Sequence, residues 1–443
     1  PIPGRVRAWR TTKYQKFQPV DSPPQWETWT AVSPVGIQID PAERYQEVLG
    51  FGGAFTDASC YLFHQMPAES RHALLSELYG PAGLGLSVGR TCMGSSDYST
   101  EMYSYDESPA PDPALKGFSI DHDRKWILPT LREAREVNPD LFLFSSPWSP
   151  PGWMKPNGSM LGGCMDSKYF PAYAQYFIRF LRDYSAAGVK TQAVTVQNEV
   201  DTDQVRRMPA AVWGQEYEIG FVKDHLGPAL KQASLDTKIW ILDHNYNLWG
   251  RVVDELSDPE VYKHVDGVAW HGYVGTPDAM TRVHDDFPAK HAYWTEGGPD
   301  ITSPAYATNW AEWSRTFAQI LRNRARCIVS WNLVLDEKGK PNIGPFSCGG
   351  LVTIHSKTQQ LTRSGMYYAF AHYSKVILRG ARIFASSGDL PGIDHVVAEN
   401  ADGGRVLVIT NSDSGREQRV QCTLGPHALD VTLDPDSIIS LVW

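Results

Sequence analysis

Short apolar runs alternate with amphipathic segments along most of the chain. Each run is bounded by turn residues and has the length of a strand that is buried on both faces. Eight of them follow one another, at residues 50–55, 84–93, 141–146, 193–196, 238–242, 267–270, 292–296 and 328–335. The pattern predicts strands at these positions.

The segments between these strands often place apolar residues three and four positions apart, which is the period of a helix. We predict helices at residues 67–80, 126–137, 169–186, 214–232 and 310–322. The first of them has Pro67 in its opening turn and Gly80 at its end, as helix termini favour.

Strands that alternate with helices predict a parallel sheet, and eight such units predict a closed (β/α)₈ barrel. The alternative is an open, doubly wound sheet with a phosphate-binding loop after its first strand. Residues 50–53 contain a Gly-x-Gly sequence, but Phe55 stands where the last glycine of that fingerprint belongs. We therefore interpret residues 50–55 as a barrel strand that packs closely against its neighbours.

The pattern changes after residue 373. Short strands separated by Asp, Gly, Ser and Pro are predicted at residues 405–410, 419–424, 429–433 and 437–443. They indicate a β-sandwich, completed by strand-like residues 35–48, whereas residues 1 to 30 read as irregular. The predicted division is an N-terminal sandwich segment at 1–48, the barrel at 49–373 and the C-terminal sandwich at 374–443.

Charge and composition exclude several classes of protein. The net charge of −9 gives no basic footprint for nucleic acid, and no apolar run is long enough for an integral membrane segment. Nothing in the sequence specifies an oligomeric state. Because the chain begins at Pro1 rather than Met, we expect a secreted or periplasmic protein whose leader has been removed.

The six cysteines lie far apart, without a Cys-x-x-Cys pair, so we expect neither a zinc site nor a disulfide framework. A single bridge between distant segments stays open. No cofactor or metal is expected. The 15 Trp and 20 Tyr residues suit the apolar faces of sugars, although large cores also use them.

Two carboxylates stand where predicted strands end. Glu199 follows the fourth strand and Glu296 ends the seventh. A single Glu at such a place is often only solvated. In a (β/α)₈ barrel, however, functional groups gather at the carboxyl ends of the strands, and strands four and seven lie on opposite sides of the mouth. Two opposed carboxylates without metal ligands are what glycosidic bond cleavage requires.

At these residues the chain resembles glycoside hydrolase family 30, most closely its glucosylceramidase-like branch. The resemblance covers nearly the whole chain and is carried by residues 50–57, 90–97, 146–155, 195–199, 270–273, 331–332 and 367–377. It implies a barrel joined to a β-sandwich. It also implies a retaining double displacement, with Glu199 as acid/base and Glu296 as nucleophile.

The same resemblance implies a set of substrate-binding residues, namely Arg90, Asp97, Trp148, Trp153, Asn198, His271, Tyr273 and Trp331. Asn198 would hold the sugar 2-hydroxyl, although Asn at a strand end can also cap backbone. Arg90 would hydrogen-bond the nucleophile, or form a structural ion pair.

Asp97 and Trp148 would bind the distal hydroxyls, and Trp331 would be the platform under the ring rather than a core residue. His271 and Tyr273 would line the floor of the site, Tyr273 near the nucleophile, although His271 is equally well a core histidine. Trp153 and His244 are weaker candidates.

The chain departs from the family in two places. Val200 follows Glu199, where the family usually has proline, so the loop carrying Asp201 and Asp203 is expected to run differently. The Gly-rich segment 336–350 differs from that of the lysosomal enzymes and is expected to shape the aglycone side of the cleft.

The expected function is hydrolysis of β-D-glucosides in a carbohydrate or glycolipid substrate. The alternatives are a β-xylosidase, an endo-acting β-1,6-glucanase or xylanase, and a non-catalytic carbohydrate-binding protein. A closed pocket would favour exo action on glucosides, and a long open groove would favour endo action.

Overall fold

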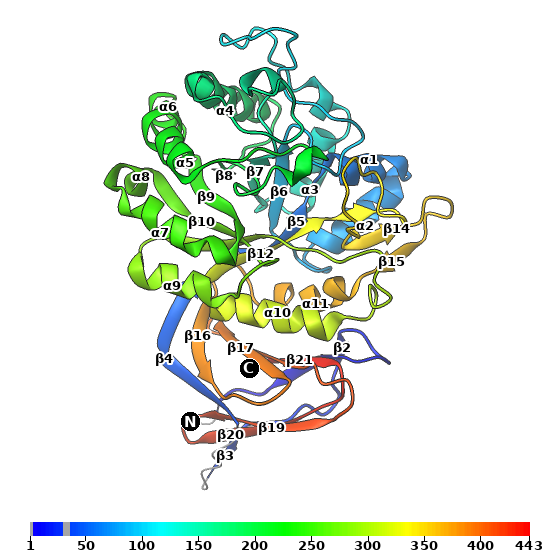
Figure 1. The fold of residues 1–443 in the computed structure, drawn as a ribbon. Coiled ribbons are helices and arrows are strands. Elements are labelled where there is room, and N and C mark those ends of the chain that lie inside the picture. Colours follow the sequence, from blue (N-terminus) through cyan, green and yellow to red (C-terminus); the bar gives the residue numbers. More distant parts are fainter. Residues whose placement is uncertain (1–2, 30–35) are drawn as a thin grey trace.

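The computed structural model describes residues 3–29 and 36–443 and has a closed barrel of parallel strands at its centre (Figure 1). Its eight strands pair in chain order, and β12 closes against β5. They are β5 (Gly50–Ala54), β6 (Val88–Met93), β7 (Phe142–Pro147), β8 (Ala193–Thr195), β9 (Lys238–Asn245), β10 (Val265–His271), β11 (His291–Glu296) and β12 (Ala325–Asn332). The eight predicted strands and the (β/α)₈ barrel are confirmed.

Close packing of the first strand explains its glycines. Every residue of β5 is buried. A Cβ atom added at Gly52 would lie only 1.6 Å from the carbonyl oxygen of Val88 on the neighbouring strand β6. Glycine is therefore required for β5 and β6 to pair, and the Gly-x-Gly sequence belongs to the barrel wall.

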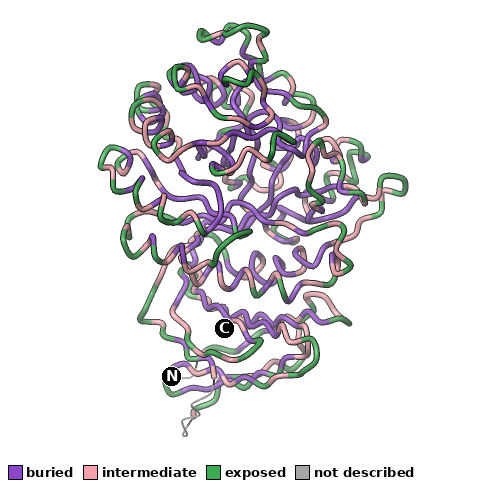
Figure 2. Tube along the Cα trace, in the orientation of Figure 1, coloured by how far each residue is buried: buried purple, intermediate pink, exposed green. Residues whose placement is uncertain are grey.

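Helices surround the barrel, and the strands inside them form the most continuously buried part of the chain (Figures 1 and 2). They are α1 (Asp57–Gln65), α2 (Ala68–Tyr79), α3 (Ile127–Val137), α4 (Phe170–Ala186), α5 (Gln215–Phe221), α6 (Gly227–Gln232), α7 (Trp249–Ser257), α8 (Pro259–His264), α9 (Asp278–Asp286), α10 (Trp310–Arg322) and α11 (Gly365–Ser374). Their buried side chains pack on the barrel strands in one large core.

The predicted helix at 214–232 is two helices joined by a wider, π-helical turn at Val222–Leu226. Pro228 lies in the first turn of α6. Proline has no N–H to donate into the turn before it, so a regular α-helix cannot continue through this position.

The two ends of the chain meet in one ten-stranded sheet, with the strand order β2-β1-β21-β18-β17-β16-β4-β19-β20-β3. Its strands are β1 (Arg7–Thr11), β2 (Gln18–Pro19), β3 (Glu27–Thr28), β4 (Ile37–Glu47), β16 (Arg382–Ser387), β17 (Ile393–Glu399), β18 (Arg405–Asn411), β19 (Gln418–Leu424), β20 (His427–Leu433) and β21 (Ser437–Val442). The sheet encloses a separate apolar core and forms the attached β-sandwich. A small third sheet contains β13 (Val334–Leu335), β14 (Val352–Ile354) and β15 (Leu361–Arg363).

Several strands of the sandwich differ from the prediction. The expectation that residues 1 to 30 are irregular is wrong for β1, β2 and β3. β1 is held in the sheet by β21, more than 400 positions away along the chain. β16 and β17 were not predicted because their apolar residues alternate only weakly with polar ones. The predicted start of β4 at Val35 lies outside the described residues.

Helices α10 and α11 lie between the barrel and the sandwich (Figure 1). The buried ring of His372 on α11 bonds to both ends of the chain. Its Nε2 atom lies 2.7 Å from Thr11 Oγ1, and its Nδ1 atom lies 2.8 Å from Ser440 Oγ. Burial lowers the pKa of His372 to about 3, so the ring stays neutral between the two hydroxyls.

We propose to divide the chain after residues 48 and 373. β4 belongs to the sandwich and β5 to the barrel, and α11 is the last helix before the chain returns to the sandwich at β16.

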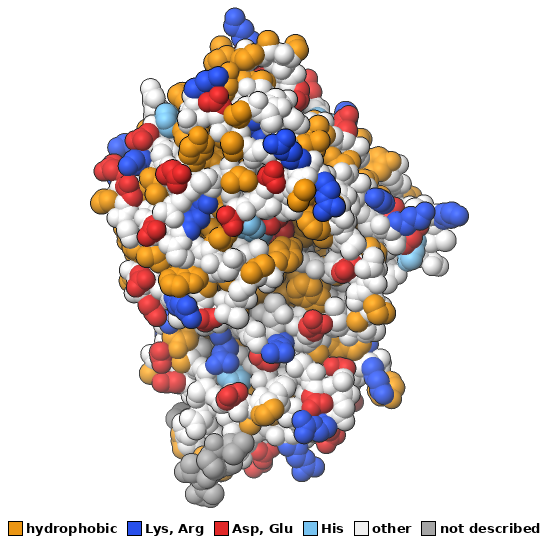
Figure 3. Space-filling view, viewed as in Figure 1, with side chains coloured by type: hydrophobic (Ala, Val, Ile, Leu, Met, Phe, Trp, Pro, Cys, Tyr) orange, Lys and Arg blue, Asp and Glu red, His pale blue; other side chains and the backbone are white. Residues whose placement is uncertain are grey.

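No helix within residues 3–29 and 36–443 combines the length and the apolar character that crossing a membrane requires. On the face drawn in Figure 3, basic and acidic side chains are interspersed among the described residues.

The packing of β5 predicts a difference between two glycine substitutions. Gly52→Ala should lower the free energy of unfolding by about 3 kcal/mol or more, because its methyl group meets backbone of β6. Gly220→Ala in α5, where a methyl group meets no atom within 4 Å, should raise it by about 0.5–1 kcal/mol. Denaturant unfolding of both variants checks this, and a Gly52→Ala variant as stable as the wild type would contradict it.

Candidate active site

Two glutamates face each other at the carboxyl ends of the barrel strands. Glu199 lies just after β8, the fourth barrel strand, and Glu296 is the last residue of β11, the seventh. Glu199 has a left-handed backbone, with φ of 57°, and its N–H donates to the carbonyl oxygen of Asp243 at 2.9 Å. Carboxylate oxygens of the two glutamates lie within 4.8 Å of each other.

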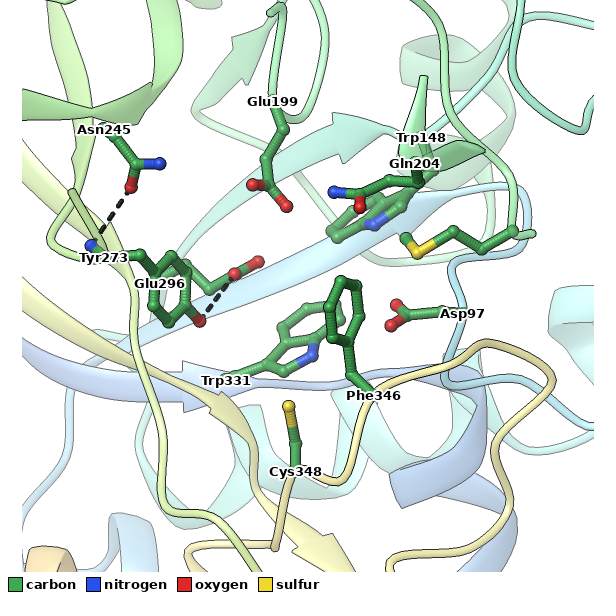
Figure 4. Close-up of a pocket in the computed structure, with 11 residues that line it drawn as sticks. Asp97, Trp148, Glu199, Gln204, Asn245, Tyr273, Glu296, Trp331, Phe346 and Cys348 are labelled. Atoms are coloured by element: carbon green, nitrogen blue, oxygen red, sulfur yellow. Dashed lines mark hydrogen bonds between the residues drawn. The ribbon is translucent and has the colours of Figure 1, made fainter. Parts of the chain in front are cut away.

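A cavity of about 320 Å³ opens between the two glutamates (Figure 4). This volume is near the lower end of the range for ligand pockets. The cavity is lined by Asp97, Trp148, Glu199, Gln204, Met208, Asn245, Tyr273, Glu296, Trp331, Phe346 and Cys348.

Beneath the cavity, the carboxylate of Asp243 is fully buried at the end of β9. It accepts hydrogen bonds from Arg90 at 2.8 Å, from Thr195 and Thr295 at 2.7 Å each, and lies 2.8 Å from His271 Nε2. Burial raises the pKa of Asp243, but the charge of Arg90 and the hydrogen bonds of His271 and Thr295 outweigh it and hold that pKa well below its usual range.

Arg90, also fully buried, extends from β6 to four acceptors, one of which is the Ser146 hydroxyl at 3.3 Å. Its guanidinium donates to Glu296 at 2.7 Å and to both Asp243 and the Asn198 side chain at 2.8 Å. One cation therefore fixes the carboxylate of Glu296 and the amide of Asn198 relative to each other. The expected hydrogen bond between Arg90 and Glu296 is present in the structure.

The carboxylate of Glu296 has further partners. Tyr273 donates its hydroxyl hydrogen bond to Glu296 at 2.9 Å, and His271 Nδ1 lies 3.7 Å from the same oxygen. Burial lowers the pKa of His271, but the charge of Glu296 and the hydrogen bond to Asp243 outweigh it, so the pKa is raised. A charged imidazolium can donate to Asp243 and present its second N–H toward Glu296.

Glu199 has a different environment. Its carboxylate lies 3.0 Å from His244 Nε2 and is more open to solvent than that of Glu296. Burial raises the pKa of Glu199, but the hydrogen bond of His244 and the charges of His271 and Arg90 outweigh it, so the pKa lies below its ordinary value.

Asp97 and Trp148 line the side of the cavity away from Tyr273, and Trp331 lies at its base between Glu296 and Cys348 (Figure 4). The rings of Trp148 and Trp331 stack with centroids 5.0 Å apart, and the guanidinium of Arg90 lies 4.7 Å from the Trp148 ring. Burial, together with the charges of the two glutamates, raises the pKa of Asp97 well above its usual value. A protonated Asp97 can donate as well as accept hydrogen bonds.

Glu199, His271 and Glu296 form a group with metal-ligand types within 4.8 Å of one another. The oxygens of Glu296 already accept from Arg90 and Tyr273, and His271 Nε2 already bonds to Asp243. We therefore assign these side chains to the hydrogen-bond network of the site.

Comparison with known proteins agrees with this geometry. The model of the glycosyl hydrolase family 30 TIM-barrel domain matches residues 48–377. The chain belongs to this family. It is a glycosyl hydrolase, and the resemblance seen in its motifs is confirmed.

Two curated relatives of this family 30 enzyme carry different names. An endo-1,6-β-D-glucanase of Neurospora crassa is 34% identical over 394 residues, which cover 85% of this chain and 81% of the relative. Putative glucosylceramidase 3 of Caenorhabditis elegans is 33% identical over 436 residues, which cover 92% and 82%. Among solved structures, the endo-β-1,6-glucanase BT3312 superimposes with a TM-score of 0.87 at 28% identity, covering 99% of this chain and 100% of that one.

Most of the predicted site residues of this family 30 enzyme come together in the structure. Asp97, Trp148, Tyr273 and Trp331 line the cavity with the two glutamates, and Arg90, Asn198, His244 and His271 lie against them. Trp153 is not among the described residues that line the cavity. Its indole N–H donates to the carbonyl oxygen of Asp106, and its ring packs against Tyr169, so a role in sugar binding has no geometric support.

Sequence reasoning missed Asp243 and five residues of the cavity wall, which are Gln204, Met208, Asn245, Phe346 and Cys348. Asp243 lies near the end of the fifth barrel strand, as the two glutamates do near theirs, but only the fold shows that Arg90 reaches it. Asn245 is the last residue of β9, whereas Gln204, Met208, Phe346 and Cys348 lie in long loops, where no periodicity indicates which side chains turn inward. Segment 336–350 contributes Phe346, beside Asp97, and Cys348, beside Trp331, to the cavity wall (Figure 4), and that it shapes the aglycone side stays a prediction.

The buried anion of this family 30 enzyme can be tested with Asp243→Asn. Arg90 would lose a buried counter-charge, so the free energy of unfolding at pH 7 should fall by about 3–5 kcal/mol. Hydrolysis of an aryl β-glucoside should fall by about 100-fold, because Arg90 and His271 are no longer held in place. Thr281→Val, at an outer hydrogen bond between Thr281 and Asn323, serves as a control and should leave hydrolysis unchanged.

The stability difference between wild type and Asp243→Asn also has a defined pH dependence. Because the folded pKa of Asp243 lies below the unfolded value of about 3.9, its contribution is complete above that value and is lost as the pH falls through the folded pKa. Denaturant unfolding should show a constant difference above about pH 5 and a smaller one at about pH 3. A difference that grows on acidification would contradict this assignment.

Proposed function

We propose that this enzyme is a retaining β-glycosidase that hydrolyses β-D-glucosides of primary alcohols, with β-1,6-linked glucan as its first substrate. The observation that carries the mechanism is the separation of Glu199 and Glu296, whose oxygens lie within 4.8 Å of each other. Retaining enzymes hold their carboxyl groups about 5–5.5 Å apart, whereas inverting enzymes leave room for a water molecule between them.

The environments of the two glutamates support different roles. Glu296 is held by Arg90 and Tyr273 and faces the cavity as a fixed carboxylate, which suits a nucleophile that attacks the anomeric carbon. Glu199 is more exposed and has His244 as its partner, which suits a residue that exchanges protons with the leaving group and then with water.

The acid role requires a proton on Glu199, while the neighbouring His244, His271 and Arg90 favour its ionised form. A sugar in the cavity acts in the opposite direction, because excluding water disfavours a carboxylate. Glu199 then protonates the leaving oxygen as Glu296 forms the glycosyl–enzyme bond. In the second half, ionised Glu199 takes a proton from water, which attacks the same carbon and releases Glu296.

The remaining groups are assigned to sugar binding. Asn198, fixed by Arg90, is proposed to bind the 2-hydroxyl, where a hydrogen bond gains strength in the transition state. Asp97 and Trp148 are proposed to bind the distal hydroxyls, and Trp331 to lie under the ring.

The relatives support the choice of substrate. Several of them are named endo-1,6-β-glucanases, and others are named glucosylceramidases. In both kinds of substrate a β-D-glucosyl unit leaves a primary alcohol, through O6 of the next glucose or through the CH₂–O group of ceramide. The cavity of about 320 Å³ encloses a short part of either substrate, so the remainder extends out over the rim. Glucosylceramide is therefore the second candidate.

A substrate panel tests the proposed linkage. We expect faster cleavage of a β-1,6-linked glucan than of β-1,3- or β-1,4-linked glucans, and faster cleavage of an aryl β-D-glucoside than of an aryl β-D-xyloside. The first-formed sugar anomer, followed by NMR, should be β. An α anomer first would overturn the retaining mechanism, and preference for glucosylceramide over β-1,6-glucan would move the second candidate ahead.

Azide tests the two carboxylate roles separately. In Glu199→Ala, an aryl glucoside whose leaving group needs no proton should still form the glycosyl enzyme, and azide should release it as the β-glucosyl azide. In Glu296→Ala, azide should displace the leaving group directly and give the α-glucosyl azide. Glu296→Gln should lose turnover while still folding, with a lower unfolding midpoint because Arg90 loses one of its two buried counter-charges. Azide products of the opposite anomeric form would reverse the two roles.

A further inference from the structure

A strained turn lies in the loop that follows Glu199. Three consecutive residues other than glycine, Gln204, Val205 and Arg206, have positive φ angles of 52°, 52° and 56°. For Val205, with ψ of 33°, this left-handed conformation is a genuine outlier, because a β-branched side chain crowds the backbone there. Such strain persists only where surrounding contacts hold it, and it concentrates at functional sites.

Contacts within the loop hold this turn. The N–H of Gln204 donates to Thr202 Oγ1 and that of Val205 to Asp203 Oδ1, both at 3.0 Å. The N–H of Arg206 donates to the Asp203 carbonyl oxygen, also at 3.0 Å. Each hydrogen bond closes a ring of only a few residues, so together they fix the three left-handed positions.

A second loop, the one that follows β7, supports the turn from outside. Gly162 packs directly against it: a Cβ atom at this glycine would lie 2.6 Å from Arg206 Cγ and 2.9 Å from the Asp203 carbonyl oxygen. Nearby, buried Lys155 joins the two loops, because its Nζ donates to the carbonyl oxygens of Met160 at 3.0 Å and Ala210 at 2.8 Å.

The turn brings the amide of Gln204 into the cavity. Figure 4 shows this side chain beside Trp148 and directed toward Glu199, on the side away from Tyr273. Its amide atoms make no hydrogen bond to any residue that the structure describes, so both its donor and its acceptor are available to a ligand. Because Gln204 and Glu199 line the same cavity and the amide points toward Glu199 in this view, the amide faces the group that exchanges protons with the leaving oxygen.

We propose that Gln204 determines specificity by hydrogen-bonding a hydroxyl of the sugar that leaves, and that the strained turn exists to hold its amide there. This inference rests on the proposed function, because it places the leaving group on the Glu199 side of the cavity. It makes the enzyme selective for a hydroxylated leaving group, such as the next glucose of a β-1,6-linked chain, over an aryl group.

The test compares two substrates through the ratio of their kcat/KM values, a β-1,6-linked glucose disaccharide over a nitrophenyl β-D-glucoside. Gln204→Met keeps the length of the side chain and removes the amide, so the ratio should fall about tenfold. Gln204→Gly removes the side chain and suits the positive φ, so it folds even if the methionine variant does not, and its ratio should fall equally. A ratio within twofold of the wild type in either folded variant would overturn the proposal.

The role of backbone strain at Val205 is tested by measuring the melting temperature together with the ratio of kcat/KM values. Val205→Gly should raise the melting temperature by about 1–2 °C and lower the ratio, because the relaxed turn no longer fixes the amide. Gly162→Ala should displace the turn, and it should lower both the melting temperature and the ratio of the kcat/KM values. Ser234→Gly, at a positive φ of 54° just after α6, is the matched control, which should raise the melting temperature without changing the ratio.

The outcomes separate this inference from the proposed function. If the wild type cleaves the aryl glucoside but not the β-1,6 disaccharide, the proposed specificity for β-1,6 linkages is wrong. The ratio is then measured with whichever β-linked disaccharide is cleaved, and a wild type that cleaves none overturns the role of Gln204 as well. Equal losses on both substrates in the Gln204 variants would overturn the inference alone, and an inactive wild type would overturn both.

Discussion

The buried ion pair between Arg90 and Asp243 is the interaction on which the site depends. Neither charge has contact with solvent, so each is tolerable only because the other is present and the remaining hydrogen-bonding positions are filled. Its value lies in geometry: Arg90 connects β6 to Glu296, to Asn198 and to the anion on β9. Side chains from separate barrel strands thus occupy fixed positions before any substrate enters, which is the preorganisation that catalysis requires.

The barrel strands place the two glutamates, and the loops between strands and helices form the walls of the cavity around them. Parallel strands end at one rim, so Glu199 and Glu296 meet there although they are far apart in sequence. The loops after β7 and β8 then close one side of the cavity, and segment 336–350 closes another with Phe346 and Cys348. We thus propose that side chains at the strand ends carry out the reaction and that side chains on the loops select the leaving group.

The same division explains what the sequence could predict. Apolar runs identify the eight barrel strands, and a carboxylate at the end of two of them identifies Glu199 and Glu296, because both signals are local. Asp243 was missed since its importance depends on Arg90, which reaches it across the barrel. β1 was missed because its partner β21 lies at the other end of the chain. Gln204 turns inward through a backbone conformation that propensities disfavour for its neighbour Val205.

The pairing of β1 with β21 has a consequence for how the protein is made. During synthesis β1 emerges from the ribosome more than 400 residues before β21, so β1 stays without this partner until β21 has been made. The barrel strands, which pair in chain order, can associate before that. The sandwich therefore closes only after β21 has emerged, and a chain that terminates before β21 keeps an open sheet edge of the kind that promotes aggregation.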